Sequence, residues 1–137
     1  MYPAIHTPAA GVMDQPVEAL GGPALRAFFR LADSWNLRIA DQRKLLGGPA
    51  ESTFYKWKRE QDGTPGRDVI ERISYLLGIY KSLHILFSDP RQADEWVHRP
   101  NSAALFHGQS AMERMLSGNV SDLYVVRQYL DAQRGWN

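Results

Sequence analysis

The residues with the clearest potential for chemistry are three histidines and two glutamates in the second half of the chain: His84, His98, His107, Glu95 and Glu113. Imidazole and carboxylate groups can bind a metal ion or transfer protons, and on one helix they cooperate when they are three or four positions apart. Glu95 and His98 have this spacing, but no second pair completes a site, and His107 follows a turn. We therefore expect a surface ion pair between Glu95 and His98, and we keep an enzyme as the weaker alternative.

Other catalytic patterns are absent from the sequence. The 137 residues include no cysteine, which excludes disulfides, thiolate zinc sites and thiol nucleophiles and fits a reducing cytoplasm. We find no glycine-rich phosphate loop, no nucleophile elbow and no Ser/His/Asp arrangement. The sequence thus predicts no catalytic residue, no metal site and no cofactor.

A second group of polar residues has the composition of a DNA-binding surface. In the segment ESTFYKWKR (residues 51–59), Phe54 and Trp57 are spaced to point inward, which leaves hydroxyl, amine and guanidinium groups on the outside. Such groups hydrogen-bond to base edges and neutralise phosphates. The candidates for DNA contact are Arg43, Lys44, Ser52, Thr53, Tyr55, Lys56, Lys58 and Arg59.

The charge distribution supports the same surface. Between Arg38 and Arg59 the chain has six basic and two acidic residues, a local charge of +4 in a chain whose total is +1. This concentration favours contact with phosphates. The alternative is that the charges only solvate a helix, since similar trihelical units occur in proteins that do not bind DNA.

The elements that must position these residues are all predicted to be helical. Residues 1–22 contain prolines and glycines without a sustained period and are predicted to form a flexible leader. The first helix is predicted to begin at Pro23, a second to end at Gly47-Gly48, and a third to cover the segment around Phe54. These three helices have helix-turn-helix proportions. Ala50 is a weak start for the third helix, where Ser or Thr would be preferred.

The second half of the chain continues the helical pattern. A long apolar stripe over residues 67–87 includes Leu86, and Gly78 is a point at which this helix could bend or divide. Ser88 or Asp89 is expected to cap the next helix, and Ser121 is expected to cap the last one. No segment alternates as a strand does, so the fold class is all-α: an N-terminal helix-turn-helix bundle joined to a small C-terminal helical domain. We place the boundaries at 1–22, 23–80 and 81–137.

Composition sets the remaining limits. An apolar content of 44% and an aromatic content of 11% are sufficient for a packed interior. No apolar run approaches the roughly 18–20 residues that span a bilayer, and the first 22 residues lack the features of a signal peptide. The sequence therefore predicts a cytoplasmic protein that does not enter a membrane.

The C-terminal half resembles a known domain. Leu86-Phe87, the spacing from Trp96 to Pro100-Asn101, the segment FHGQSAMERML and the segment GNVSDLYVVRQYLD are similar to the toxin-binding domain of the Xre/MbcA/ParS antitoxins. The family's glycine, hydroxyl residue and proline correspond here to Gly108, Ser110 and Ala111, so the proline is replaced. Residues around LLGGPAESTFYKWKRE resemble the helix-turn-helix half of the same family, and the likeness covers residues 24–137.

This resemblance implies a type II antitoxin. Such proteins bind a RES-domain toxin that consumes NAD, block its NAD pocket, and repress their own operon by binding operator DNA. They commonly form homodimers or toxin–antitoxin hetero-oligomers. The resemblance assigns toxin binding to the C-terminal region, where our candidates are Asp122, Arg127, Asp131, Arg134, Trp136 and Asn137.

Two alternatives remain open at this stage. The chain could be a stand-alone helix-turn-helix repressor that uses its C-terminal domain only to dimerise. The C-terminal tail could be a frayed terminus, and Asp122 and Arg127 could form an ordinary surface ion pair.

Overall fold

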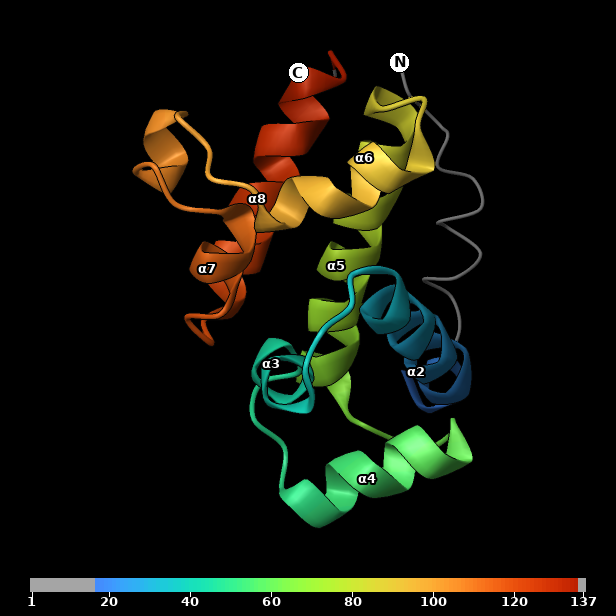
Figure 1. The fold of residues 1–137 in the computed structure, drawn as a ribbon. Coiled ribbons are helices and arrows are strands. Elements are labelled where there is room, and N and C mark those ends of the chain that lie inside the picture. Colours follow the sequence, from blue (N-terminus) through green and yellow to red (C-terminus); the bar gives the residue numbers. More distant parts are fainter. Residues whose placement is uncertain (1–16, 136–137) are drawn as a thin grey trace.

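The computed structural model describes residues 17–135, and Figure 1 shows their arrangement. These residues contain helices and no strand, which confirms the all-α fold; a single isolated bridge joins Pro100 and Ser110. The elements are α2 (Val17–Ser34), α3 (Ile39–Leu45), α4 (Glu51–Glu60), α5 (Arg67–Leu86), α6 (Pro90–Glu95), the 3-10 turns Trp96–His98 and Ala104–Phe106, α7 (Ala111–Met115) and α8 (Val120–Gln133). Within this part of the chain, no helix combines the length and apolar character needed to cross a bilayer.

Helix α2 begins earlier than the sequence suggested. It starts at Val17, so the predicted start at Pro23 is wrong, and Pro23 lies inside the helix. Gly21 and Gly22 are buried, and a Cβ atom built on Gly21 would lie 2.0 Å from the carbonyl oxygen of Gly63. The glycines therefore permit close packing between α2 and the loop after α4, where the sequence had suggested flexibility. The first sixteen residues of the predicted leader lie outside the described residues.

Two predicted helix starts can be compared directly with the structure. The prediction for α6 is confirmed: Asp89 is the N-cap, its carboxylate accepts a hydrogen bond of 3.0 Å from the N–H of Arg91, and Pro90 occupies the first turn. The prediction for α8 is wrong, because its N-cap is Asn119 and Ser121 lies within the first turn. Helix α5 is continuous from Arg67 to Leu86, so Gly78 does not divide it.

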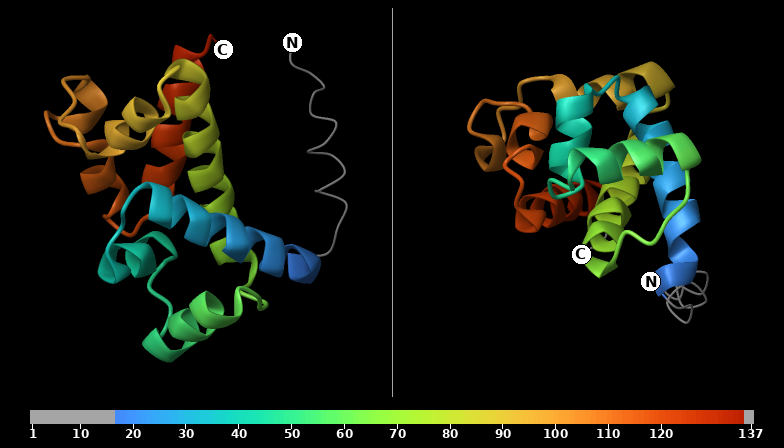
Figure 2. Two further views of the ribbon diagram at one scale, coloured as in Figure 1. Left: turned by 45° about the vertical axis from the view of Figure 1, so that its right-hand side comes forward. Right: turned by 90° about the horizontal axis from the view of Figure 1, so that it is seen from below.

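Helix α5 is shared by both halves of the molecule. It packs against both α2 and α8. Figure 2 shows α5 and α8 side by side, running in the same direction and finishing at the same end of the molecule. Helix α4 lies at the opposite end (Figure 1).

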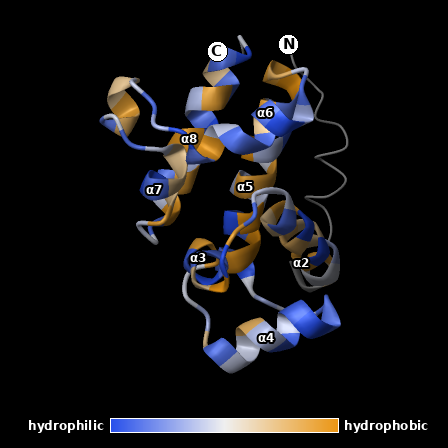
Figure 3. Ribbon diagram, in the orientation of Figure 1, coloured by the Kyte–Doolittle hydropathy of each residue, from blue (hydrophilic) through white to orange (hydrophobic). Residues whose placement is uncertain are grey.

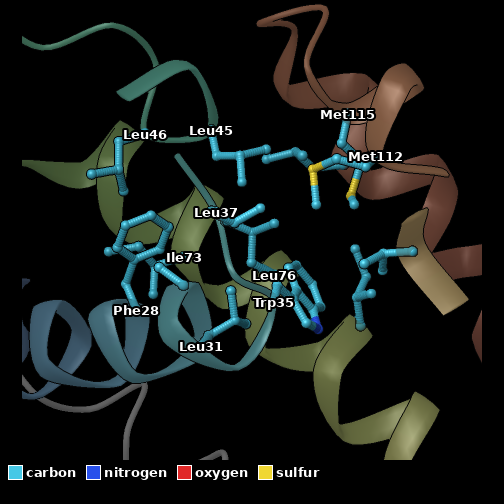
Figure 4. Packing of buried hydrophobic residues seen from close by; sticks show 14 of the residues in the cluster. Phe28, Leu31, Trp35, Leu37, Leu45, Leu46, Ile73, Leu76, Met112 and Met115 are labelled. Atoms are coloured by element: carbon cyan, nitrogen blue, oxygen red, sulfur yellow. The ribbon is translucent and has the colours of Figure 1, made fainter. Parts of the chain in front are cut away.

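The two halves also share one hydrophobic core. Figure 4 shows Trp35, Leu37 and Leu45 of the N-terminal half in the same packed cluster as Met112 and Met115 of α7. All five side chains are buried. Because flexible methionine side chains fill irregular gaps, they suit the seam where the two halves meet.

Candidate DNA-binding and partner-binding surfaces

The turn between α3 and α4 is held in a defined shape. Gly47 and Gly48 follow α3 with φ angles of 93° and 76°, a region that glycine enters without strain. The guanidinium of Arg43 donates a hydrogen bond of 2.9 Å to the carbonyl of Pro49, which ties α3 to the residues that precede α4. Ala50 is the N-cap of α4 and makes no side-chain cap, as its sequence predicts.

Helix α4 has one buried and one exposed face. Phe54 and Trp57 are buried, which confirms their predicted inward orientation. Phe54 packs edge-on against Phe29 of α2, with ring centroids 5.8 Å apart. Figure 3 shows most of α4 in the hydrophilic half of the colour scale. The exposed side chains include Ser52, Thr53, Tyr55, Lys56 and Arg59.

The other candidates for DNA contact differ in their surroundings. Lys44 is exposed near the end of α3, whereas Arg43 is half-buried by its contact with Pro49. Lys58 is also half-buried, and its ammonium lies 5.1 Å from the centroid of the Phe29 ring. Arg43 and Lys58 thus contribute to packing in addition to any contact with phosphate. Arg38 is exposed at the start of α3 and pairs with Asp41 at 3.3 Å.

At the start of α8, Asp122 is engaged within its own domain. Its carboxylate accepts hydrogen bonds from the Arg114 guanidinium at 2.9 Å and from the Ser117 hydroxyl at 2.5 Å. The Ser117 hydrogen bond and the Arg114 guanidinium lower the pKa of Asp122, against the opposing effect of burial. Asp122 therefore does not pair with Arg127, and its position fixes the turn between α7 and α8.

At the other end of α8, three of the candidate residues are tied to α5. Asp131 accepts a hydrogen bond of 3.2 Å from the hydroxyl of Ser82, and the guanidinium of Arg134 donates one of 3.1 Å to the same hydroxyl. Arg127 lies 3.7 Å from the Asp131 carboxylate and packs against Gly78, where a Cβ atom would lie 2.6 Å from its guanidinium. The structure brings Arg127, Asp131 and Arg134 together, while Trp136 and Asn137 lie outside the described residues.

Sequence reasoning missed two residues beside this cluster. Ile85 and Leu86, in the last turn of α5, are 54% and 37% exposed, so the expectation that Leu86 is buried is wrong. The helical period placed Leu86 on the apolar stripe, but the period does not reveal where the neighbouring helix ends.

Comparison with known proteins identifies both halves of the chain. Residues 17–78 match the antitoxin Xre-like helix-turn-helix domain, and residues 82–135 match the antitoxin Xre/MbcA/ParS C-terminal toxin-binding domain. The chain belongs to the Xre/MbcA/ParS family of antitoxins. The antitoxin is also similar to a protein of Sinorhizobium fredii (strain NBRC 101917 / NGR234) described as uncharacterized protein y4oB. The two are 55% identical over 111 residues, which cover 81% of the antitoxin and 84% of that protein.

The family motif in the toxin-binding domain has a structural role in this antitoxin. Ser110 forms a capping box with Glu113: its hydroxyl accepts from the Glu113 N–H at 3.0 Å, and the Glu113 carboxylate accepts from the Ser110 N–H at 2.8 Å. Ala111, in the place of the family's proline, is the first residue of α7. The N–H of Asn101 donates to the carbonyl of Gln109 at 3.0 Å, so the Pro-Asn and Gly-Gln-Ser segments lie side by side.

An aromatic cluster anchors the same domain. Trp96 packs edge-on against Phe106 and stacks on Tyr129 of α8, with centroid separations of 5.9 and 6.3 Å. Trp96 is half-buried, and Phe106 is buried. This arrangement makes Trp96 an anchor between the 3-10 turn at Phe106 and helix α8.

Four of the five residues that suggested chemistry, His84, His98, Glu95 and Glu113, have contacts within the fold. His98 Nε2 lies 2.7 Å from the carbonyl oxygen of Trp35, and His84 Nε2 lies 2.8 Å from the Asp94 carboxylate. Glu95 pairs with Arg99, so the expected ion pair with His98 is wrong. Among residues 17–135, no group of three or more histidine, cysteine, aspartate or glutamate side chains is placed to hold a metal ion.

Proposed function

We propose that this antitoxin binds a RES-domain toxin and blocks the NAD pocket of the toxin with its C-terminal tail. The observation that carries the proposal is the arrangement at the end of α8. Ser82 and Asp131 hold Arg134, whose side chain is only 10% exposed, and thereby fix the point from which the chain continues to Trp136. A tail that leaves a fixed base loses less entropy on entering a pocket than one attached to a mobile helix.

The proposed toxin-binding residues are Arg127, Asp131, Arg134, Trp136 and Asn137. In this proposal Asp122 contributes indirectly, because its hydrogen bonds to Arg114 and Ser117 hold the start of α8 in place. Arginine and tryptophan are enriched at binding hot spots, which supports this assignment. The antitoxin acts by occlusion in this proposal and needs neither a catalytic residue nor a cofactor of its own.

We also propose that the antitoxin represses its own operon through α4. The exposed hydroxyl and basic groups of α4 lie on one face, while Phe54 and Trp57 anchor the helix in the core. In this proposal α4 enters the major groove, and Lys44, Lys56 and Arg59 neutralise phosphates. Operator recognition by a homodimer or by a toxin–antitoxin hetero-oligomer would place two such helices on one DNA duplex.

The decisive experiment uses the protein encoded in the reading frame next to that of the antitoxin, which this proposal expects to have a RES domain. We expect the full-length antitoxin to bind this protein and to suppress its consumption of NAD in a purified assay. Deletion of residues 136–137 should restore NAD consumption and leave operator binding intact. This deletion tests the tail more specifically than one that begins at Arg134, because loss of Arg134 also removes the hydrogen bond to Ser82.

Two results would contradict the proposal. If the shortened antitoxin still suppresses NAD consumption fully, the blocking element lies elsewhere. If the full-length antitoxin binds operator DNA but not the RES-domain protein, the alternative of a stand-alone repressor that dimerises through its C-terminal domain is correct.

A further inference from the structure

The last turn of α5 exposes two adjacent aliphatic side chains. Ile85 is 54% exposed and Leu86 is 37% exposed. A single exposed leucine is common on protein surfaces. Two large aliphatic side chains exposed in the same helical turn form a small apolar patch. Removing such groups from water is favourable by about 25 cal/mol for each Å² of apolar surface.

The register of α5 against α8 explains why this patch is uncovered. Gly78 of α5 contacts Arg127 of α8. One turn further along both helices, Ser82 contacts Asp131. The two helices therefore run in parallel, in step with each other, as Figure 2 shows. Helix α8 ends at Gln133, opposite the turn of α5 that contains Ser82.

The next turn of α5 extends past the end of its partner helix. Ile85 and Leu86 follow Ser82 by three and four positions, so they lie on the side of α5 that α8 covers in the preceding turns. Within residues 17–135, α8 ends before it can cover them. The apolar patch and the start of the C-terminal tail thus lie at the same end of the molecule.

Polar groups from α5 and from the end of α8 lie next to this patch. Arg134 and Asp131 are fixed by the Ser82 hydroxyl, and Lys81 is exposed one turn before Ile85. An apolar centre with a polar margin is the usual anatomy of a protein–protein interface.

We propose that Ile85 and Leu86 form the apolar centre of the surface that docks onto the toxin. The inference rests on the proposed function and assigns the partner an apolar recess beside its NAD pocket. Three observations favour the toxin as the occupant. The patch lies within residues 82–135, which match the toxin-binding domain; it adjoins the base of the tail; and it lies away from α4, so docking leaves the DNA-binding face open.

The test compares two full-length variants for affinity to the protein encoded in the neighbouring reading frame, the expected RES-domain toxin. The first is the double variant Ile85→Glu/Leu86→Glu, which places two carboxylates in the proposed apolar centre. The second is Tyr124→Glu, a matched control, because Tyr124 is a large side chain of α8 that is 44% exposed near the opposite end of that helix. Titration calorimetry gives each dissociation constant, and operator binding through α4 verifies that each variant is folded.

We expect the double variant to bind the toxin about 100-fold more weakly and Tyr124→Glu to bind within about threefold of the unaltered antitoxin. Equal affinity of the double variant and the unaltered antitoxin would overturn the proposal. So would a change in the molar mass of the free antitoxin, measured by light scattering, without a change in toxin affinity, because the patch would then serve self-association.

The deletion of residues 136–137 separates this inference from the proposed function. If the deletion abolishes neutralisation while the double variant neutralises normally, the function stands and the docking surface is wrong. If the unaltered antitoxin does not bind the RES-domain protein, both are wrong.

Discussion

The guanidinium of Arg72 donates a hydrogen bond of 3.0 Å to the carbonyl of Gly118, which lies 46 positions later in the chain. Arg72 is on α5 and is 9% exposed, and its Nε also contacts the Asp68 carboxylate at 3.1 Å. A Cβ atom on Gly47 would lie 2.9 Å from the same Nε. One side chain thus touches the turn that precedes α4 and the turn that precedes α8.

Replacement of Arg72 with methionine should lower the free energy of unfolding by about 2 kcal/mol, because the Gly118 carbonyl loses its donor and Asp68 loses its ion pair. Urea denaturation measures the effect. Arg67→Met is the control, since Arg67 is exposed at the start of α5, and it should change stability by less than about 0.5 kcal/mol. Equal losses in the two variants would mean that Arg72 does not link the two turns.

Lys56→Ala should weaken binding to DNA from the region upstream of the antitoxin's reading frame. It should reduce the slope of log affinity against log salt concentration by about one, because one phosphate contact is lost. Thermal stability should not change, since Lys56 is exposed. Lys81→Ala, near the far end of α5, is the control and should leave the slope unaltered.

Lys58→Ala should differ from Lys56→Ala in one respect. Its ammonium lies over the Phe29 ring, so its loss should also lower the free energy of unfolding by about 0.5–1 kcal/mol. Salt-dependent DNA binding and urea denaturation of the same sample separate the two effects. A Lys58→Ala variant with unchanged stability and unchanged DNA affinity would contradict both predicted contacts of Lys58, one with the Phe29 ring and one with DNA phosphate.

Asp122→Asn should lower the free energy of unfolding at neutral pH. It should also make this free energy fall less steeply as the pH is lowered below about 4. The pKa of Asp122 is lower in the folded protein than its ordinary value of about 4, owing to Ser117 and Arg114. The carboxylate therefore stabilises the fold above about pH 4, and this contribution is lost as the pH falls through the folded-state pKa.

We expect a loss of about 1–2 kcal/mol at pH 7 for Asp122→Asn, and a smaller difference from the unaltered antitoxin below pH 4. Urea denaturation at several pH values is the measurement. Asp33→Asn, at an exposed position near the end of α2, is the matched control and should reproduce the stability profile of the unaltered antitoxin. A pH-independent loss for Asp122→Asn would show that the charge of Asp122 is not what stabilises the turn.

Ser110→Ala should lower the free energy of unfolding by about 1 kcal/mol, because it removes one half of the capping box of α7. Ser102→Ala, at an exposed position in the preceding loop, should have little effect. If the two substitutions cost the same, the capping box does not stabilise α7.

Some features that depend on local interactions were predictable from the sequence, whereas the cap of α8 and the partner of Glu95 were not. The inward spacing of Phe54 and Trp57 and the cap at Asp89 involve residues within one or two turns of each other, and the structure has all of them as expected. The resemblance to the antitoxin family, which the comparisons confirm, extended this reasoning to both domains.

Features that depend on distant segments were not predictable in the same way. The early start of α2 requires Gly21 to pack on the carbonyl of Gly63, more than forty positions away. The exposure of Leu86 requires knowledge of where α8 ends relative to α5. The surroundings of Asp122 were not predictable either, because nothing in the sequence indicated that Arg114 and Ser117 would both donate hydrogen bonds to its carboxylate.

The continuity of α5 bears on how such antitoxins can diversify. The two domain matches meet between residues 78 and 82, inside an unbroken helix, where most two-domain proteins have a linker. A recombination event at that point would join half of one helix to half of another. Arg72 would then lie beside a different turn before α8, and Ser82 would be joined to a different N-terminal half of α5. A lineage that acquires a new toxin specificity must therefore inherit α5 together with the domain it supports, or rebuild both faces of that helix by point mutation.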